Sequence, residues 1–467
     1  YTTSVVYDSR GNRIQVTDAA GGRMKSFFDG LNRLLRTESG YFWDGAVESV
    51  PPGMFNLSNP DGKITTRYGY DANSRLTSIV DDNTRVTSFG YDNLGRQTRI
   101  TYPDGTCKQI GYDRDSMATL WELISYTGAR LAVATRYDPL HRAVRKEVDN
   151  GQAPMFSGTK RQEFEYDGLG RMPRATADVD LSDGILDSEV VLAYDSLGNV
   201  ISETQSYQDL STGLLLQGSN TVTSEHDGTG FRTRVAYPGG RTIGFLPDEL
   251  NRLDTLADSY TGSTRYDYLG PARVMNRLFP NNTRLTMLSG ADDILVAGYD
   301  GARRAVDFAH KTGGDAPAVL AEFAYGFDRA GNRLFERRIH EPSGAGWRGE
   351  TYSYDAVYRL VDRREGDLDA SGVLQGAASS SQGFTLDGAG NWKSYTRDSV
   401  SYANTTNSLN QYTTFQGPLG GRTLAYDFAG NLSNESLPEW SNRQYGYDFG
   451  NRLVSYLDPA YNRTVYR

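Results

Sequence analysis

Short runs of alternating polar and apolar residues recur along the whole chain. "KITTRYGY" (63–70) and "RVTSFGY" (85–91) are typical, and each leads into a cluster rich in Asp, Asn and Gly. A period of two predicts half-buried β-strands, and the Asp, Asn and Gly clusters predict turns between them. We therefore predict strands of about seven residues joined by tight turns.

One of these turns has a fixed pattern, Tyr-Asp-x-x-Gly-Arg/Asn. With the acid as marker we find 17 copies, and Asn407 takes the same place in an eighteenth, at spacings of 19 to 42 residues. The copies that show the pattern most clearly contain Tyr7, Asp8 and Gly11; Tyr91, Asp92 and Gly95; Tyr166, Asp167 and Gly170; Tyr194, Asp195 and Gly198; Phe327, Asp328 and Gly331; and Tyr426, Asp427 and Gly430.

Each position of the motif has a physical reason in a hairpin corner. The residue three after the marker is Gly or Asn in 13 copies, which predicts a left-handed backbone. The Asp side chain is expected to accept hydrogen bonds from N–H groups one to three residues on. The following Arg or Asn is expected to reach back to the turn carbonyls, and the aromatic residue forms a rung of a ladder.

The opposite ends of the hairpins are marked by a second kind of turn. "NPDGK" (59–63), "YPDGT" (102–106), "YPGGR" (237–241) and "FPNNT" (279–283) place Pro before Gly, Asn or Asp. Each unit is thus two strands with a turn at each end. The chain then predicts an all-β fold, one antiparallel sheet of more than 30 strands, which must curl into a hollow spiral shell or tube.

The spacing of the motif predicts the organisation of this array. Residues 1–467 form a single array in which repeats of about 21 residues occupy 1–130 and 400–467. Lengthened repeats occupy most of 138–387, and the interval of 42 residues predicts an insertion loop at 40–58. The sequence ends in mid-pattern, so we expect it to be a piece of a longer polypeptide.

Composition and charge exclude several other classes of protein. The net charge is −9 without a basic block, which argues against nucleic-acid binding. No apolar run is long enough to cross a membrane. Cys107 is the only cysteine, so an internal disulfide cannot form. The chain is rich in Gly (51) and Tyr (31), as expected for many short strands and turns.

The motif resembles that of the YD-repeat, or RHS-repeat, family, and the likeness extends over essentially the whole chain. The segments that carry it best are Tyr7–Asn12, Tyr91–Arg96, Tyr166–Arg171, Tyr194–Asn199, Phe327–Asn332 and Tyr426–Asn431. The family includes bacterial Rhs polymorphic toxins, cocoon components of insecticidal toxin complexes, wall-associated proteins and teneurins. The resemblance implies a hollow β-shell, which in the toxins encloses a C-terminal effector.

One feature of the toxin members is missing from this sequence. Their shells usually end in a core segment with Asp-Pro-x-Gly-Leu-type motifs linked to autoproteolysis. The Asp-Pro pairs here, Asp138-Pro139 and Asp458-Pro459, do not match that motif. The resemblance therefore implies shell wall alone, without a plug, protease site or effector.

Two segments are candidate sites outside the motif. Tyr41, Phe42, Trp43 and Phe55 belong to the predicted insertion and are candidate contact residues for a sugar or a protein, although folding over the shell surface explains them more simply. Asp367, Asp369 and Ser371 begin like a calcium loop but lack the acid at its twelfth position, so they are a weak metal candidate.

The sequence predicts no catalytic residue and no cofactor. The four histidines have no metal-ligand spacing, and 18 equivalent corners are not how an active site is arranged. We therefore predict a non-enzymatic scaffold of a secreted bacterial protein that encloses an effector domain or neighbouring repeats of the same polypeptide. The alternative is an extracellular adhesin or fibre that binds cell-surface glycans, proteins or further copies of itself.

Overall fold

The computed structural model describes residues 2–43, 46–50, 59–149, 158–179, 181, 186–207, 220–287, 298–314, 317–344, 346–418, 420–437, 440–458 and 463–466. These residues contain 38 β-strands and no helix, so none of them forms a helix that could cross a membrane. The strands make one continuous sheet.

The first half of the sheet is formed by strands of two to ten residues. They are β1 (Ser4–Tyr7), β2 (Arg13–Thr17), β3 (Gly22–Phe28), β4 (Leu34–Trp43), β5 (Glu48–Ser49), β6 (Ile64–Tyr70), β7 (Leu76–Val80), β8 (Val86–Tyr91), β9 (Gln97–Thr101), β10 (Cys107–Tyr112), β11 (Ala118–Ile124), β12 (Arg130–Tyr137), β13 (Ala143–Asp149), β14 (Arg161–Glu165), β15 (Arg174–Asp178), β16 (Ser188–Tyr194), β17 (Val200–Tyr207), β18 (Asn220–His226) and β19 (Arg232–Ala236).

The second half contains longer hairpins around β27 to β29. Its strands are β20 (Thr242–Pro247), β21 (Leu253–Asp258), β22 (Gly262–Leu269), β23 (Arg273–Leu278), β24 (Thr283–Thr286), β25 (Asp307–Thr312), β26 (Val319–Phe327), β27 (Arg333–Ser343), β28 (Gly346–Tyr354), β29 (Leu360–Leu368), β30 (Ser380–Leu386), β31 (Trp392–Arg397), β32 (Val400–Thr406), β33 (Tyr412–Gly417), β34 (Gly420–Tyr426), β35 (Leu432–Leu437), β36 (Trp440–Tyr447), β37 (Leu453–Asp458) and β38 (Arg463–Tyr466).

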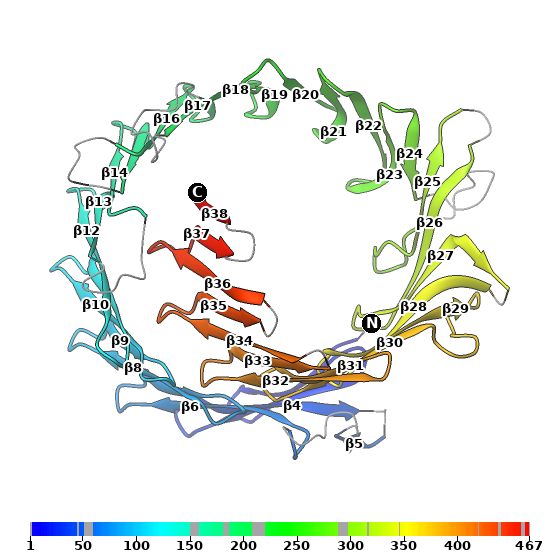
Figure 1. Ribbon diagram of the computed structural model, residues 1–467, viewed down its shortest axis with the longest axis horizontal. Coiled ribbons are helices and arrows are strands. Elements are labelled where there is room, and N and C mark those ends of the chain that lie inside the picture. Colours follow the sequence, from blue (N-terminus) through cyan, green and yellow to red (C-terminus); the bar gives the residue numbers. More distant parts are fainter. Residues whose placement is uncertain are drawn as a thin grey trace.

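Successive strands pair antiparallel, as expected for a chain of hairpins. Within the described residues the exception is β5, which pairs with β4 as a side hairpin while β4 also pairs with β6. The sheet curls into a ring, and from the corner between β28 and β29 the chain begins a second turn along the first. Strands β31 to β38 of this second turn lie inside the ring, along β4 to β12 (Figure 1). The predicted all-β spiral of continuous hairpins is confirmed, and the spiral is open.

The ring has little conventional core. Among the described residues, 10 apolar and 20 polar or charged residues are buried, so polar groups are the majority of what is enclosed. The accessible surface is 26120 Å², whereas a compact protein of 51.7 kDa would expose about 17,000 Å². The fold is therefore held by the strand ladder, by the corners and by contacts between turns.

Candidate functional site: corners, inner face and seam

The corner built on Asp92 shows how the motif folds. The Asp92 N–H donates to the carbonyl oxygen of Arg96 and its carbonyl accepts from Gly95 N–H, both at 3.0 Å. This is a type I turn followed by a left-handed residue that starts a bulge. Register shifts recur at the same place, for example between Gly90 and Tyr91. The six motif glycines have φ of 83° (Gly11), 83° (Gly95), 80° (Gly170), 89° (Gly198), 100° (Gly331) and 92° (Gly430).

The Asp side chain accepts hydrogen bonds from the backbone N–H groups inside this turn. Oδ1 of Asp92 accepts from the N–H groups of Leu94 and Arg96 at 2.9 Å, and Oδ2 accepts from Nε of Arg96 at 2.7 Å. The bond from Leu94, two residues on, is the one expected from the sequence. The bond from Arg96 lies one residue beyond the expected range, because the bulge turns the N–H of the fourth residue towards the carboxylate. Desolvation raises the pKa of Asp92, but the bonds from Arg96 outweigh it and leave the pKa below its ordinary value.

The Arg after the turn ties its corner to the next one. Arg96 Nη1 donates to the carbonyl of Asp113 at 3.0 Å, and its guanidinium lies 4.7 Å from the centre of the Tyr112 ring. The Tyr112 hydroxyl donates back to the carbonyl of Gln97 at 2.9 Å. The expectation that this Arg bonds the carbonyls of its own turn was wrong. Its Nε donates to Asp92, which directs the rest of the guanidinium towards the next corner.

The same coupling recurs along the array. The pairs that stack an Arg of one corner on the aromatic residue of the next are Arg33 and Tyr70, Arg75 and Tyr91, Arg142 and Tyr166, Arg171 and Tyr194, Arg252 and Tyr268, and Arg304 and Phe327. Where Asn replaces Arg, its amide bonds the Asn of the next corner, as in Asn12 to Asn32 at 2.9 Å and Asn431 to Asn451 at 3.0 Å.

The marker at Asp267 was wrong by two residues. Asp267 lies inside β22 at a bulge, and Tyr268 takes the aromatic role. The Tyr268 hydroxyl donates to the carbonyl of Leu253 at 2.7 Å, and the turn follows at Gly270 with φ of 64°. Residues two apart in a strand share a face, so a Tyr-x-Tyr segment offers two equivalent aromatic candidates to a pattern search.

Contacts between the two turns identify the inner face of the sheet. A cavity of about 540 Å³ is lined by Lys108, Trp121 and Leu123 of the first turn and by Phe428 and Phe449 at corners of the second. Because the second turn lies inside the ring, this side of β10 and β11 faces inward (Figure 1). Residues opposite each other in an antiparallel pair share a face, so the registers extend this assignment from strand to strand.

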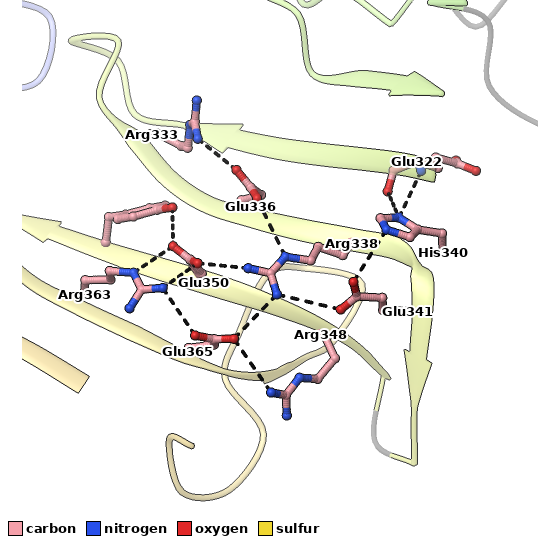
Figure 2. Close-up of polar contacts among 11 residues, drawn as sticks. Glu322, Arg333, Glu336, Arg338, His340, Glu341, Arg348, Glu350, Arg363 and Glu365 are labelled. Carbon is pink, nitrogen blue, oxygen red and sulfur yellow. Dashed lines mark hydrogen bonds and ion pairs between the residues drawn. The ribbon is translucent and has the colours of Figure 1, made fainter. Parts of the chain in front are cut away.

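The inner face of β27, β28 and β29 carries a network of charged residues. Glu350 lies at its centre and accepts from Arg363 at 2.6 and 2.8 Å, from Arg338 at 3.0 Å and from the Tyr352 hydroxyl at 2.7 Å (Figure 2). The bond from Arg363 lowers the pKa of Glu350. The other members are Arg333, Arg348, Glu336, Glu341 and Glu365. Four arginines balance four glutamates, so the network stiffens the wall without adding net charge.

Beyond this network the inner face becomes aromatic. The rings of Tyr395 and Tyr402 stack at 4.5 Å with an interplanar angle of 2°, and Arg422 lies 4.3 Å from the centre of the Phe415 ring. These four residues line a groove of about 450 Å³ together with Leu437 and the glycines of the β33–β34 turn. No motif in the sequence marked this groove, because its members come from five separate strands.

The seam between the turns is made of corner residues. The Tyr358 hydroxyl donates to Oδ2 of Asp18 at 2.6 Å, over 340 residues of chain. Asn83 Nδ2 donates to Oδ2 of Asp387 at 3.0 Å, over 304 residues. The marker carboxylates of this second turn, Asp355, Asp387, Asp427 and Asp448, are buried. One turn of the spiral therefore takes about three hundred residues or slightly more.

The other predicted site residues lie apart from the seam. Tyr41, Phe42 and Trp43 form the end of β4 and not a loop, because Gly22 and Arg23 of β3 continue the ladder opposite them. Tyr41 is buried beneath Lys25, whose ammonium lies 4.2 Å from the ring centre, and Arg23 lies 4.4 Å from the centre of Trp43. Phe55 falls outside the described residues, as does most of the predicted insertion.

The weak metal candidate is an ordinary corner. Oδ1 of Asp369 accepts from the N–H groups of Ser371 and Val373 at 2.8 and 3.0 Å, while Asp367 belongs to β29. Within the part of the chain that the structure describes, no three His, Cys, Asp or Glu residues are placed to hold a metal ion together.

These features define an open, hollow β-shell made of hairpin repeats with polar corners. Residues 70–106 match the family model described as RHS Repeat, and this match supports the resemblance to the RHS-repeat, or YD-repeat, family that the sequence motif predicts. No curated protein matches the chain.

Several solved structures share the fold. The structure described as TcdB2-TccC3-Cdc42 matches with a TM-score of 0.68 and 14% identity, over 98% of this chain and 26% of that chain. The structure described as TcdB2-TccC3 matches with a TM-score of 0.68 and 14% identity, over 99% of this chain and 27% of that chain. The structure of the Photorhabdus luminescens Tc holotoxin pore matches with a TM-score of 0.66 and 15% identity, over 98% of this chain and 25% of that chain. The chain thus spans about a quarter of the solved chains it matches.

Proposed function

We propose that this chain is a non-enzymatic wall segment of a secreted bacterial shell, and that its inner face surrounds an effector domain of the same polypeptide, encoded outside residues 1–467. The observation that carries the proposal is the spiral itself. A sheet that passes once around a ring and then starts a second turn inside it makes a container, whereas a fibre needs no enclosed space.

The inner face supports this role. It carries the charge-balanced network centred on Glu350 and the aromatic groove at Tyr402. Such surfaces can contact an enclosed polypeptide without a single strong binding site. The likeness to TcdB2-TccC3 supports the same role by analogy of fold. The adhesin alternative has no comparable observation in its favour.

Limited proteolysis of the full-length polypeptide tests the proposal. Segments outside residues 1–467 should be cut at least about tenfold more slowly within the intact protein than when the same segments are expressed alone, because the wall keeps the protease out. The matched control is a mixture of the separate wall and the separate segment, which should give no protection. Equal cleavage rates in the intact protein and in the mixture would exclude encapsulation.

A further inference from the structure

One contact across the seam joins the β7–β8 turn of the first turn to the β30–β31 corner of the second. We call Asp82, Asn83, Asp387 and Gly388 the clasp. The Asn83 amide donates to Oδ2 of Asp387, a carboxylate that also accepts from Asn391 at 2.8 Å and is only 3% exposed. Asp82 accepts from the N–H of Thr65 through Oδ1 at 2.6 Å, and its Oδ2 faces Gly388.

Gly388 fits the clasp because it has no side chain. A Cβ added there would overlap Oδ2 of Asp82. Four glycines hold the same place in other corners, directly after the marker Asp, and a Cβ added to any of them would meet no atom within 4 Å: Gly30, Gly168, Gly228 and Gly301. The demand for glycine at position 388 thus comes from docking between turns and not from the corner fold.

The clasp brings together carboxylates and neutral donors. The charged groups around Asp82 are Asp61, Asp81 and Arg67 of the first turn, with Arg85 beyond the turn and Asp387 opposite. Burial, followed by repulsion from Asp61 and Asp81, raises the pKa of Asp82 above its ordinary value of 3.8. The part of this rise in pKa that comes from burial of Asp82 beneath Gly388 exists only when the turns are docked. That part makes the stability of the seam fall as the pH rises through the raised pKa of Asp82.

We propose that the clasp is the joint at which the shell opens, and that negative charge on Asp82 loosens it, so that acid closes the seam. This regulation rests on the proposed function, since a container needs a joint. The hydrogen bonds from Asn410 Nδ2 to Oδ2 of Asp81 and from Arg85 Nη2 to Oγ1 of Thr406, which lie beside the clasp, are both long at 3.4 Å. A short bond across the seam, from Tyr358 to Asp18 at 2.6 Å, lies apart from the clasp at the β2–β3 corner. Within each turn, by contrast, the strand ladder is continuous.

Distance measurements between spin labels test the clasp on the 467-residue chain without any cargo. Cys107 is buried, so cysteines introduced at the exposed Val86 and Thr396 can be labelled selectively across the seam. The wild type should show a single short distance at about pH 4, close to the ordinary pKa of an Asp carboxyl, and gain a longer population when the pH is raised to about 7. Asp82→Asn should keep the short distance at both pH values.

The glycines provide matched variants. Gly388→Ala should show the longer population at both pH values, whereas Gly168→Ala and Gly301→Ala should match the wild type. A second label pair at Val86 and Tyr126, both in the first turn, should keep its distance in every variant, which distinguishes seam opening from unfolding.

Three results would overturn the proposal. They are a wild-type distance independent of pH, an Asp82→Asn variant with the pH response of the wild type, and a Gly388→Ala variant that behaves like the two glycine controls. Because no cargo is present, failure here leaves the protease result untouched, and failure of encapsulation leaves the distances untouched.

Discussion

At the scale of single residues, each position of the motif performs one task. The Asp carboxylate replaces water for N–H groups that the turn leaves unpaired, and the Gly or Asn adopts a backbone that other residues enter at a cost. The corner at Asp167 separates these effects because it contains two glycines. Gly170 has φ of 80°, whereas Gly168 has no left-handed backbone and open space around its Cα.

We predict that Gly170→Ala lowers the free energy of unfolding by about 1 to 2 kcal/mol, since a Cβ in the left-handed region meets its own carbonyl. Gly168→Ala should change it by less than about 1 kcal/mol, and in the stabilising direction, because alanine narrows the unfolded ensemble. Urea unfolding followed by circular dichroism measures both. Equal losses in the two variants would show that the corner does not depend on backbone conformation at Gly170.

At the scale of elements, hairpins are coupled by side chains that cross from one corner or strand to the next. The Arg96, Asp113 and Tyr112 contacts couple neighbouring corners, and the Glu350 network couples β27, β28 and β29 through one inner face (Figure 2). Such contacts matter more in a curled sheet than in a compact domain, because each strand has few apolar neighbours to fix its register.

We predict that Glu350→Gln destabilises the wall by about 1 to 3 kcal/mol, because it removes a charged acceptor of four hydrogen bonds and leaves Arg338 and Arg363 with fewer partners. Glu341→Gln is the control. Its side chain is 44% exposed and makes ion pairs of 3.6 and 3.7 Å, so the change should stay below about 0.5 kcal/mol. Thermal melting of the two variants compares them, and similar melting temperatures would contradict a structural role for the network.

At the scale of the whole molecule, the surface area is the most informative quantity. The chain exposes 26120 Å² because the ring encloses space instead of side chains. Its buried residues gather along the strand ladder and where the turns meet, and the marker carboxylates become buried only from Asp355 onward, where a second turn runs along the first.

Solution scattering gives a direct test of this shape. A compact domain of this length would have a radius of gyration of about 23 Å. The 467-residue chain should exceed that value and show a pair-distance distribution with its maximum shifted to long distances, as a hollow ring requires. A radius near the compact value, with a symmetric distance distribution, would exclude the ring.

Much of the molecule could be predicted because its decisive interactions are local. A corner is closed by residues within five positions of one another, so Asp92, Gly95 and Arg96 predict it without information on the rest of the chain. Alternation announces the strands for the same reason. The wrong predictions also came from local patterns. The motif was placed on Tyr266 although Tyr268 is the aromatic residue of that corner, and a loop was predicted at Tyr41 to Trp43 although these residues extend β4.

The sequence by itself thus determined the repeat, the corner and the need for the sheet to curl. Tertiary structure alone decided which face points inward, that Glu350 and Arg363 meet on one side, and that Gly388 docks on Asp82. The contacts between the turns depend on the total curvature of the sheet over about three hundred residues, to which every hairpin adds a small angle. A change of a few degrees per strand would bring different corners together, and the total curvature cannot be read from any local sequence pattern.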